Sequence, residues 1–447
     1  LQDDATAWAS QSGGTIQMGK VDGAYSIEVF DSTGTYGRSN NSTRSDKYTS
    51  LGGSDVLVEV TGTVSGVTRK VGLVIRNQVT AFDYATFSYG VIEGDGSGSN
   101  PGKFTGKMYG KDSINMQGNY DLTAANAESN GGTGTITPNC SSDKFATCNE
   151  NATEVTPPVL DFSFYQDQNN FTDQQVFTMT PTVGSTSSCG GNCTKWPINY
   201  QMTTGGTTYT VTASVQAQKV GSNYNHTVYW CTDPNWDGVV GNCSGTQNTY
   251  TFTSDEPENE KPFVDATQFN SYTTPSGYSS SVVNVFDAQG HLEFLGPSDP
   301  NQTETVTATI LVGTASDNST PSGKIDIEGG AGTVNFQPAN GLAIVAEKVE
   351  FKAKYSDINV SVGTAENGAA IVATEKFEVE ADHNNTADFT MNGSVVVGSS
   401  GGEDNELEIG GNGVNASFTY TTINNLPQGW SDYGSMTIQR REWRELS

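Results

Sequence analysis

The sequence predicts an all-β protein that contains a parallel β-solenoid, and three observations lead to this fold class. The 447 residues include 51 Gly among many short alternations of Val, Ile and Phe, which is typical of short strands joined by tight turns. Only 16% of residues are charged, and no long stretch keeps a helical period. The C-terminal third repeats itself at a fixed spacing, as stacked rungs do. A stacked antiparallel sandwich is the alternative architecture.

Four regions follow from the patterns along the chain. We expect a head made of the end of an N-terminal helix and a β-meander, a first part of the solenoid, a disulfide-rich β insertion and a second part of the solenoid. Their expected bounds are 1–80, 81–160, 161–300 and 301–447.

The head begins with residues 1–10, which read as the last turns of a helix whose start is missing. The chain starts at Leu1 without Met, so we expect that its N-terminus was removed by processing or by choice of the expressed segment. Residues 15–76 read as an antiparallel meander. Within it, residues 62–76 predict a hairpin that turns near Ser65.

The solenoid is predicted from a repeat near the C-terminus. Residues 341–353 (GLAIVAEKVEFKA) recur at 368–381 (GAAIVATEKFEVEA), and a weaker copy starts at Asn392. Alternation along each copy should point four side chains into one core: Val349, Phe351, Phe377 and Val379. The intervening Glu and Lys residues are interpreted as a solvated face.

The insertion at 161–300 holds four of the six cysteines and lacks the rung repeat. Because neighbours in sequence are closed at the lowest entropic cost, we expect three local disulfides. They join Cys140 to Cys148, Cys189 to Cys193, and Cys231 to Cys243. Zinc binding is the alternative, although paired C-x-x-C spacings are missing. Local disulfides indicate an oxidising compartment.

The segment from Asp233 to Val239 matches the first half of an EF-hand-type calcium loop. Asp233, Asn235 and Asp237 would supply side-chain oxygens, and Val239 its carbonyl group. The twelfth position is Ser244 instead of Glu, so the loop is incomplete. A plain Asx turn closed by the disulfide is the alternative. Calcium is the one cofactor that the sequence suggests.

Aromatic residues of the insertion are candidates for ligand binding, because flat aromatic faces suit sugar rings and anchor protein interfaces. Core filling is the alternative role. The candidate contact residues are Trp196, Tyr229, Trp230 and Trp236.

The net charge of −28 and a pI near 4.2 argue against general binding of nucleic acid, because phosphate groups would be repelled. No stretch of 18 apolar residues exists, so membrane contact is expected only through the missing N-terminal helix. The three histidines, His226, His291 and His383, lie in polar or turn contexts with no H-E-x-x-H motif or nucleophile elbow nearby, and we expect no enzyme activity.

Several segments resemble the PilX-type minor pilins of type IV pili. They are TGTVSGVTRKVGLVIR at 61–76, FDYATFSYG at 82–90, TGKMYGKDSINMQGNYDL at 105–122, and a closing stretch that ends in EWRE at 442–445. A weaker likeness exists to β-helical surface adhesins such as tapirins. The resemblance implies a pilin-like head, partner pilin subunits contacted through the N-terminal helix, and a location on the cell surface after export through the inner membrane.

Together these observations predict the soluble ectodomain of a minor pilin or pilus-associated tip adhesin. Its target would be a surface, a glycan, or a host or matrix protein. Two alternatives stay open: a polysaccharide-active β-helix enzyme, and a purely structural filament or surface-layer subunit. An enzyme would need clustered carboxylates with a basic residue in a cleft along the solenoid, whereas an adhesin needs only an exposed patch.

Overall fold

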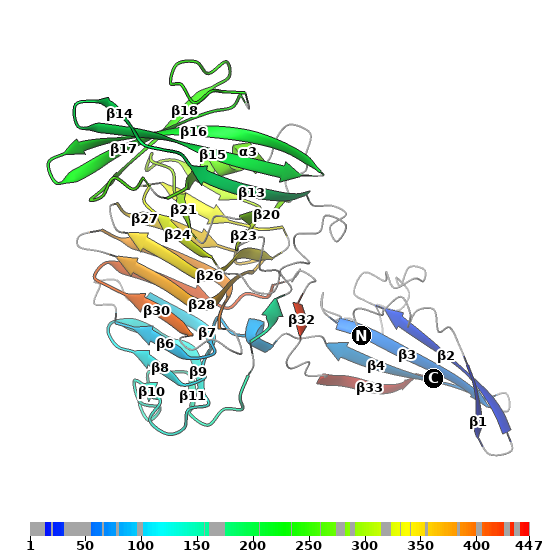
Figure 1. Cartoon of the computed structure of the whole chain (residues 1–447). Helices are drawn as coiled ribbons and strands as arrows, with labels where there is room; N and C mark the ends of the chain where they lie inside the picture. The colour runs from blue at the N-terminus through cyan, green and yellow to red at the C-terminus, as the bar shows by residue number, and fades with distance from the viewer. Residues whose placement is uncertain are drawn as a thin grey trace. The chain divides into compact units, whose positions relative to one another are not determined.

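The computed structural model confirms the predicted fold class, because almost every regular element is a strand (Figure 1). The described residues are 14–18, 21–30, 55–64, 67–76, 80–95, 102–155, 157–160, 175–204, 206–233, 235–259, 261–273, 282–286, 291–313, 323–330, 332–339, 341–353, 356–381, 385–398, 405–423, 430–432 and 439–446. The expected helix end at residues 1–10 lies outside them. The chain forms two compact units, Leu1–Thr80 with Ser435–Ser447, and Ala81–Gly434.

The smaller unit is a five-stranded antiparallel sheet. Its strands are β1 (Gly14–Met18), β2 (Val21–Phe30), β3 (Asp55–Val64), β4 (Val67–Arg76) and β33 (Gln439–Leu446). The predicted hairpin is confirmed, because Val64 pairs with Val67 across a two-residue connection. Strand β33 lies within the stretch predicted as solenoid, but it pairs with β4 as the outer strand of this sheet.

The larger unit contains a solenoid in which strands stack in parallel in three columns. The first column contains β13 (Gln175–Val183), β20 (Val282–Phe286), β23 (Thr309–Val312), β26 (Leu342–Ala353), β28 (Ala369–Ala381), β29 (Ala387–Val397), β5 (Thr86–Ser88), β7 (Gly102–Gly110), β9 (Tyr120–Ser129) and β11 (Thr147–Asn149). The second contains β19 (Phe263–Asp265), β21 (His291–Leu295), β24 (Lys324–Glu328), the second halves of β26 and β28, β30 (Glu406–Gly410), β6 (Val91–Gly94), β8 (Ser113–Met116) and β10 (Ile136–Thr137). The third contains β22 (Thr303–Val306), β25 (Thr333–Phe336), β27 (Ile358–Val362), the first half of β29, β31 (Val414–Thr419), and the first halves of β7 and β9.

The order of strands in the stack differs from their order in the sequence. The chain enters the stack at β5, and continues to β10 and β11 at one end. The later strands run from β19 and β20 at the other end to β29, β30 and β31, which pair with β5, β6 and β7 (Figure 1). The two stretches expected as parts of a solenoid therefore join into one continuous stack. Parallel rungs also begin before residue 301, since β19 to β21 already belong to the stack.

An antiparallel sheet lies across the end of the stack near β20 (Figure 1). It consists of β13, β14 (Ser187–Gly190), β15 (Cys193–Thr204), β16 (Thr207–Val220), β17 (Asn223–Cys231) and β18 (Gln247–Ser254). Strand β13 links the two parts, because it pairs antiparallel with β15 and in parallel with β20. A short helix, α3 (Ala266–Thr273), follows β19; a 3-10 turn, Thr80–Asp83, precedes β5, and β12 (Val159–Leu160) pairs with β32 (Trp430–Asp432).

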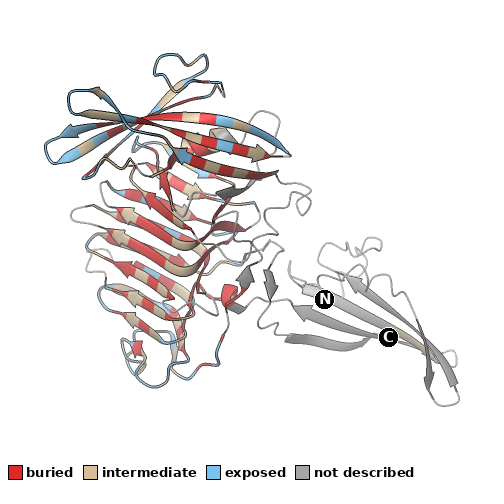
Figure 2. Ribbon diagram, viewed as in Figure 1, coloured by how far each residue is buried: buried red, intermediate tan, exposed pale blue. Residues whose placement is uncertain are grey.

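The predicted solenoid core is confirmed. Val349 pairs in register with Phe377, Phe351 pairs with Val379, and all four side chains are fully buried. Figure 2 shows buried residues along the whole stack. Phenylalanine rings pack against one another in this core: the centroids of Phe351 and Phe377 on adjacent rungs are 5.7 Å apart, and Phe389 from the third column lies 5.8 Å from Phe377. Such close packing is expected to carry most of the stability of the solenoid.

Glycine at the solenoid corners allows the turn between two columns. Gly393 has a φ of +138°, and a Cβ atom there would lie 1.9 Å from the carbonyl oxygen of Ala369. Any larger residue would clash with the neighbouring rung. The weak third copy of the repeat, which starts at Asn392, is therefore a genuine rung.

The three predicted disulfides are confirmed, and all six cysteines are paired. Cys189–Cys193 and Cys231–Cys243 lie in the antiparallel sheet and its β17–β18 connection, whereas Cys140–Cys148 lies beside the last rungs, β10 and β11. Such disulfides are typical of proteins located outside the cytoplasm.

Candidate functional site

The candidate aromatic residues do not form an exposed platform. Trp196, Trp230 and Trp236 are only 1%, 2% and 6% exposed, while Tyr229 is half-buried. The prediction of an exposed aromatic surface is therefore wrong for the three tryptophans. Their indole rings belong to the packed interior, and the alternative role of core filling applies to them.

The strand alternation of the antiparallel sheet explains this burial. Trp196 shares the inward face of β15 with Ile198 and Tyr200, while Lys195 and Asn199 take the opposite face. Successive side chains along a strand point to opposite faces of the sheet. The apolar face of β15 covers the solenoid, and the aromatic residues follow it.

Trp236 is buried for a different reason, because it lies in the connection between β17 and β18. Its indole Nε1 donates a hydrogen bond of 2.9 Å to the carbonyl oxygen of Val239. In the proposed calcium loop, that carbonyl was expected to face an ion.

The oxygens of the proposed calcium loop take part in hydrogen bonds within the loop. Asp233 Oδ1 accepts a bond of 2.9 Å from the Asn235 amide, and its Oδ2 accepts one from the Ser244 hydroxyl. Asp237 Oδ1 accepts a bond of 2.9 Å from the Val239 amide. The two bonds from backbone amides are those of Asx turns, the alternative stated for this segment. Calcium binding there stays a prediction.

A different set of polar residues lies together on the second column of the solenoid. Six acidic residues from successive rungs occupy the same register position and form a carboxylate row. Adjacent rungs of a parallel sheet lie about 4.8 Å apart, so neighbouring carboxylates approach closely. The carboxylate row consists of Glu293, Asp326, Glu350, Glu378, Glu408 and Glu93.

The carboxylate row is flanked by basic residues on the same strands. Two positions before it lie His291, Lys324, Lys348 and Lys376, and Lys352 lies two positions after Glu350. These cations form ion pairs within and between rungs. Lys324 Nζ lies 3.2 Å from Asp326 and 2.8 Å from Glu350, and Lys376 Nζ lies 2.7 Å from Glu408.

The prediction of a solvated face concerned the Glu and Lys residues of 347–352 and 375–380, and it is wrong for Glu350 and Glu378, which are buried. The acidic residues of the earlier rungs are buried as well. The side chains of Glu293, Asp326 and Glu350 are only 1%, 4% and 7% exposed. Short carboxylates at rung spacing are covered by the long stems of neighbouring lysines, whose ammonium groups reach toward water. Charges buried to this degree need close counter-ions, and the ion pairs provide them.

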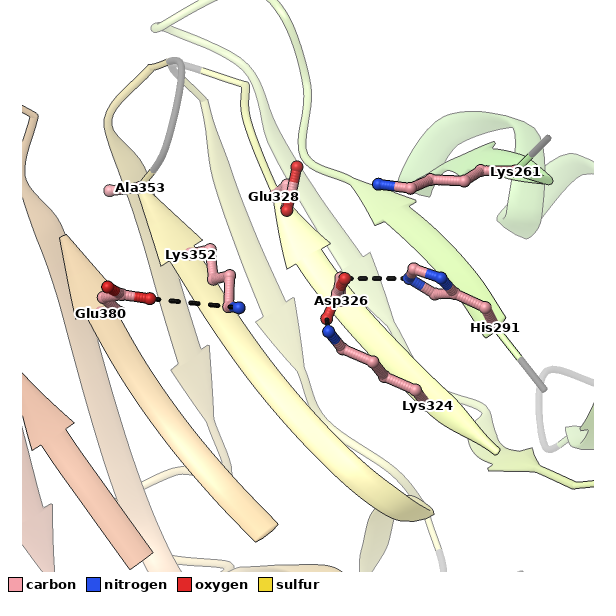
Figure 3. Close-up of a pocket in the computed structure, with 8 residues that line it drawn as sticks. All are labelled: Lys261, His291, Lys324, Asp326, Glu328, Lys352, Ala353 and Glu380. Carbon is pink, nitrogen blue, oxygen red and sulfur yellow. Dashed lines mark hydrogen bonds and ion pairs between the residues drawn. The ribbon is translucent and has the colours of Figure 1, made fainter. Parts of the chain in front are cut away.

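A pocket of about 210 Å³ opens at the end of the carboxylate row that contains Asp326. Figure 3 shows residues of four successive second-column strands and Lys261, which precedes β19, converging on it. Nearly all its lining side chains are charged; the lining residues are Lys261, His291, Lys324, Asp326, Glu328, Lys352, Ala353 and Glu380.

The ion pairs around the pocket keep its basic and acidic side chains ionised. Burial opposes the positive charge of His291, but hydrogen bonds to Asp326 and Glu293 outweigh it and raise the pKa of the imidazole to about 9. Burial likewise opposes the charge of Lys261, yet the adjacent Glu293 raises the pKa of that ammonium group. The pKa of Glu293 is lowered because His291 and Lys261 outweigh its burial. At neutral pH these groups form an ionic network.

The ligand-type atoms of His291, Glu293 and Asp326 lie within 4.8 Å of one another, close enough to share a cation. The network already supplies positive charge there, since Lys261 Nζ lies 2.8 Å from Glu293 Oε1 and His291 Nε2 lies 2.9 Å from Asp326 Oδ2. A metal ion would have to displace these groups. The geometry therefore favours the ion pairs over a metal centre.

A recurrent sequence pattern could have revealed this site. The strands carry a basic residue, an apolar residue, an acidic residue and another apolar residue in succession. The copies are HLEF at 291–294, KIDI at 324–327, KVEF at 348–351 and KFEV at 376–379. Two of these four copies lie outside the repeat recognised from the sequence, so their common register was missed.

The fold and the site together define a disulfide-bonded all-β protein with a parallel solenoid and a charged pocket on its side. Among the described residues, no helix is long and apolar enough to cross a membrane. No protein-family model matches the chain, and no curated protein matches it. Among solved structures, the chain is similar to the competence-associated pilin ComZ from Thermus thermophilus, with 11% identity and a TM-score of 0.30 over 98% of this chain and 87% of that chain. A similarity at this level carries no argument about function.

Proposed function

We propose that this chain is the exported part of a pilus-associated surface protein, a minor pilin or tip adhesin of type IV pili. The observation that supports the proposal is the pairing of β33 with β4. This pairing brings two segments that resemble PilX-type minor pilins into one sheet, although more than 360 residues separate them. Trp443 lies opposite Leu73, and Glu445 lies opposite Val71. In this proposal the small sheet is the pilin head and the solenoid is carried outside the filament.

The partners in this proposal are other pilin subunits, contacted through an N-terminal helix that precedes the described residues, and a glycan or protein on a target surface. Six paired cysteines are consistent with a location outside the cytoplasm. DNA is a poor partner for a chain with a net charge of −28.

Localisation and attachment test this proposal together. Antibodies against the solenoid should label pili in cells that carry the gene, and deletion of the gene should reduce attachment while a complemented strain recovers it. Detection of the protein only in the culture medium, or on the surface of cells that lack pili, would contradict the pilus association. The upstream gene sequence gives a separate check, because a leader peptide followed by a long apolar helix is required.

A second candidate function is that of a polysaccharide-active enzyme, and the pocket in Figure 3 favours it. Carboxylates and basic residues converge there on the side of a solenoid, which is the arrangement that an enzyme would need. Release of new reducing ends from a polysaccharide, lost on Asp326→Asn, would support this function. Absence of cleavage across neutral and acidic polysaccharides would contradict this function.

A further inference from the structure

The pocket places partly exposed basic side chains beside a buried carboxylate. Asp326 lines the pocket and is 4% exposed, and Glu293, which contacts Lys261 and His291 behind it, is 1% exposed. The side chains of Lys261, His291 and Lys324 are 30%, 31% and 29% exposed. A ligand that enters the pocket from solvent therefore meets these basic side chains, together with the half-buried Glu328 and the 39% exposed Glu380, before it meets Asp326.

The ammonium groups can bind a further acceptor. Each ammonium has three N–H donors. Lys261 contacts two carboxylates, Glu258 at 3.0 Å and Glu293 at 2.8 Å. Lys324 also contacts two, Asp326 and Glu350. One donor of each ammonium is thus left for a group in the pocket, and the buried carboxylates hold both ammonium groups in place.

From this geometry we infer that the pocket binds the anionic group of an acidic polysaccharide, a carboxylate or a sulfate ester. The inference rests on the proposed role in surface attachment and names the chemistry of the target. A pocket of about 210 Å³ has room for roughly one sugar unit.

A nucleic acid fits the same cations less well. In DNA each phosphate lies between two sugars and has no free hydroxyl group beside it. A sugar of an acidic polysaccharide carries its anionic group next to hydroxyl donors, and the pocket offers both cations and carboxylate acceptors.

The experiment removes a negative charge at the pocket, which avoids damage to the buried ion pairs. The Glu380 side chain is 39% exposed and lies 4.0 Å from Lys352. Glu380→Gln should therefore strengthen binding of polygalacturonate to the full chain by about fivefold at low ionic strength, a factor that corresponds to roughly 1 kcal/mol. Glu366→Gln is the matched control, because this exposed residue makes the same charge change away from the pocket.

Binding is measured by isothermal titration calorimetry with polygalacturonate, dextran sulfate and neutral dextran. Dextran sulfate and polygalacturonate distinguish sulfate from carboxylate as the preferred group, and either one supports the inference if Glu380→Gln tightens its binding. Weaker binding in Glu380→Gln, equal binding of dextran, or tighter binding of single-stranded DNA than of both acidic polysaccharides would overturn it.

A loss variant completes the test. Lys261→Gln should weaken acidic polysaccharide binding about tenfold, and Lys261→Arg should restore most of it, since Arg keeps the charge. Equal binding by the Gln and Arg variants would contradict the inference. The proposed function fails separately: pili without the protein, or attachment unchanged by gene deletion, would contradict the pilus role even if the pocket binds the polysaccharide.

Discussion

At the scale of single residues, the face of the strand to which a side chain points decides its exposure more than the residue type does. Trp196 and Lys195 are neighbours in sequence, yet the first is buried and the second is exposed. Residue type alone suggested that tryptophans would bind ligands. The outcome depends on which face of β15 covers the solenoid, and Ile198 and Tyr200 place Trp196 on that face.

His291 gives a residue-scale prediction about pH. Its pKa in the folded protein is about 9, above the ordinary value of 6.5, so the charged imidazole stabilises the fold fully below pH 6.5. This contribution should disappear as the pH rises from 6.5 to about 9. One pKa unit corresponds to about 1.4 kcal/mol, so the rise from 6.5 to about 9 sets an upper limit of about 3.5 kcal/mol on the loss.

Urea denaturation of wild type and His291→Gln at several pH values measures this contribution. The stability difference should be largest near pH 6 and should shrink toward pH 9. His291→Lys is the control, because Lys occupies the same register in the next rungs and stays charged in this range. A difference that is constant with pH would show that folding does not raise the pKa of His291.

At the scale of elements, the rung is the unit of stability. Strand β24 and the second halves of β26 and β28 each present alternating apolar residues to the core and charged residues to the outside, and the pattern repeats in register from rung to rung. Stacking therefore extends the apolar core inside and the carboxylate row outside at the same time. A single strand could stabilise neither of them.

Phe377→Ala tests the core of one rung. Its ring is fully buried between Phe351 and Phe389, so the truncation should lower the free energy of unfolding by about 3–5 kcal/mol. The shift of the urea midpoint measures the loss, with Glu366→Ala as an exposed control. A loss below about 1 kcal/mol would contradict the core assignment.

At the scale of the whole molecule, the solenoid is assembled from two stretches of chain that are distant in sequence. Strands β29, β30 and β31 complete the rungs that β5, β6 and β7 begin. The larger unit thus closes on itself, and the parallel columns and the three disulfides all lie within Ala81–Gly434.

This closure predicts that residues 81–434 fold without the remainder of the chain. The isolated segment should be soluble, should show a β-type circular dichroism spectrum and should unfold near the temperature of the full chain. The pocket lies inside this segment, so polygalacturonate should bind to both forms equally. An aggregated or unfolded segment would mean that the small sheet is needed for the solenoid to form.

The sequence by itself determined the local features of this protein. Residue periodicity shows directly in the letters, so the meander hairpin, the inward set Val349, Phe351, Phe377 and Val379, and the three local disulfides could all be predicted. Only the tertiary structure decided the joining of β29–β31 to β5–β7, the burial of the tryptophans and the convergence of Lys261, His291 and Asp326 on one pocket. These features depend on which rung lies on which, and on which face is covered. The free energy of such stacking arises between segments far apart in the chain, so no local pattern specifies it.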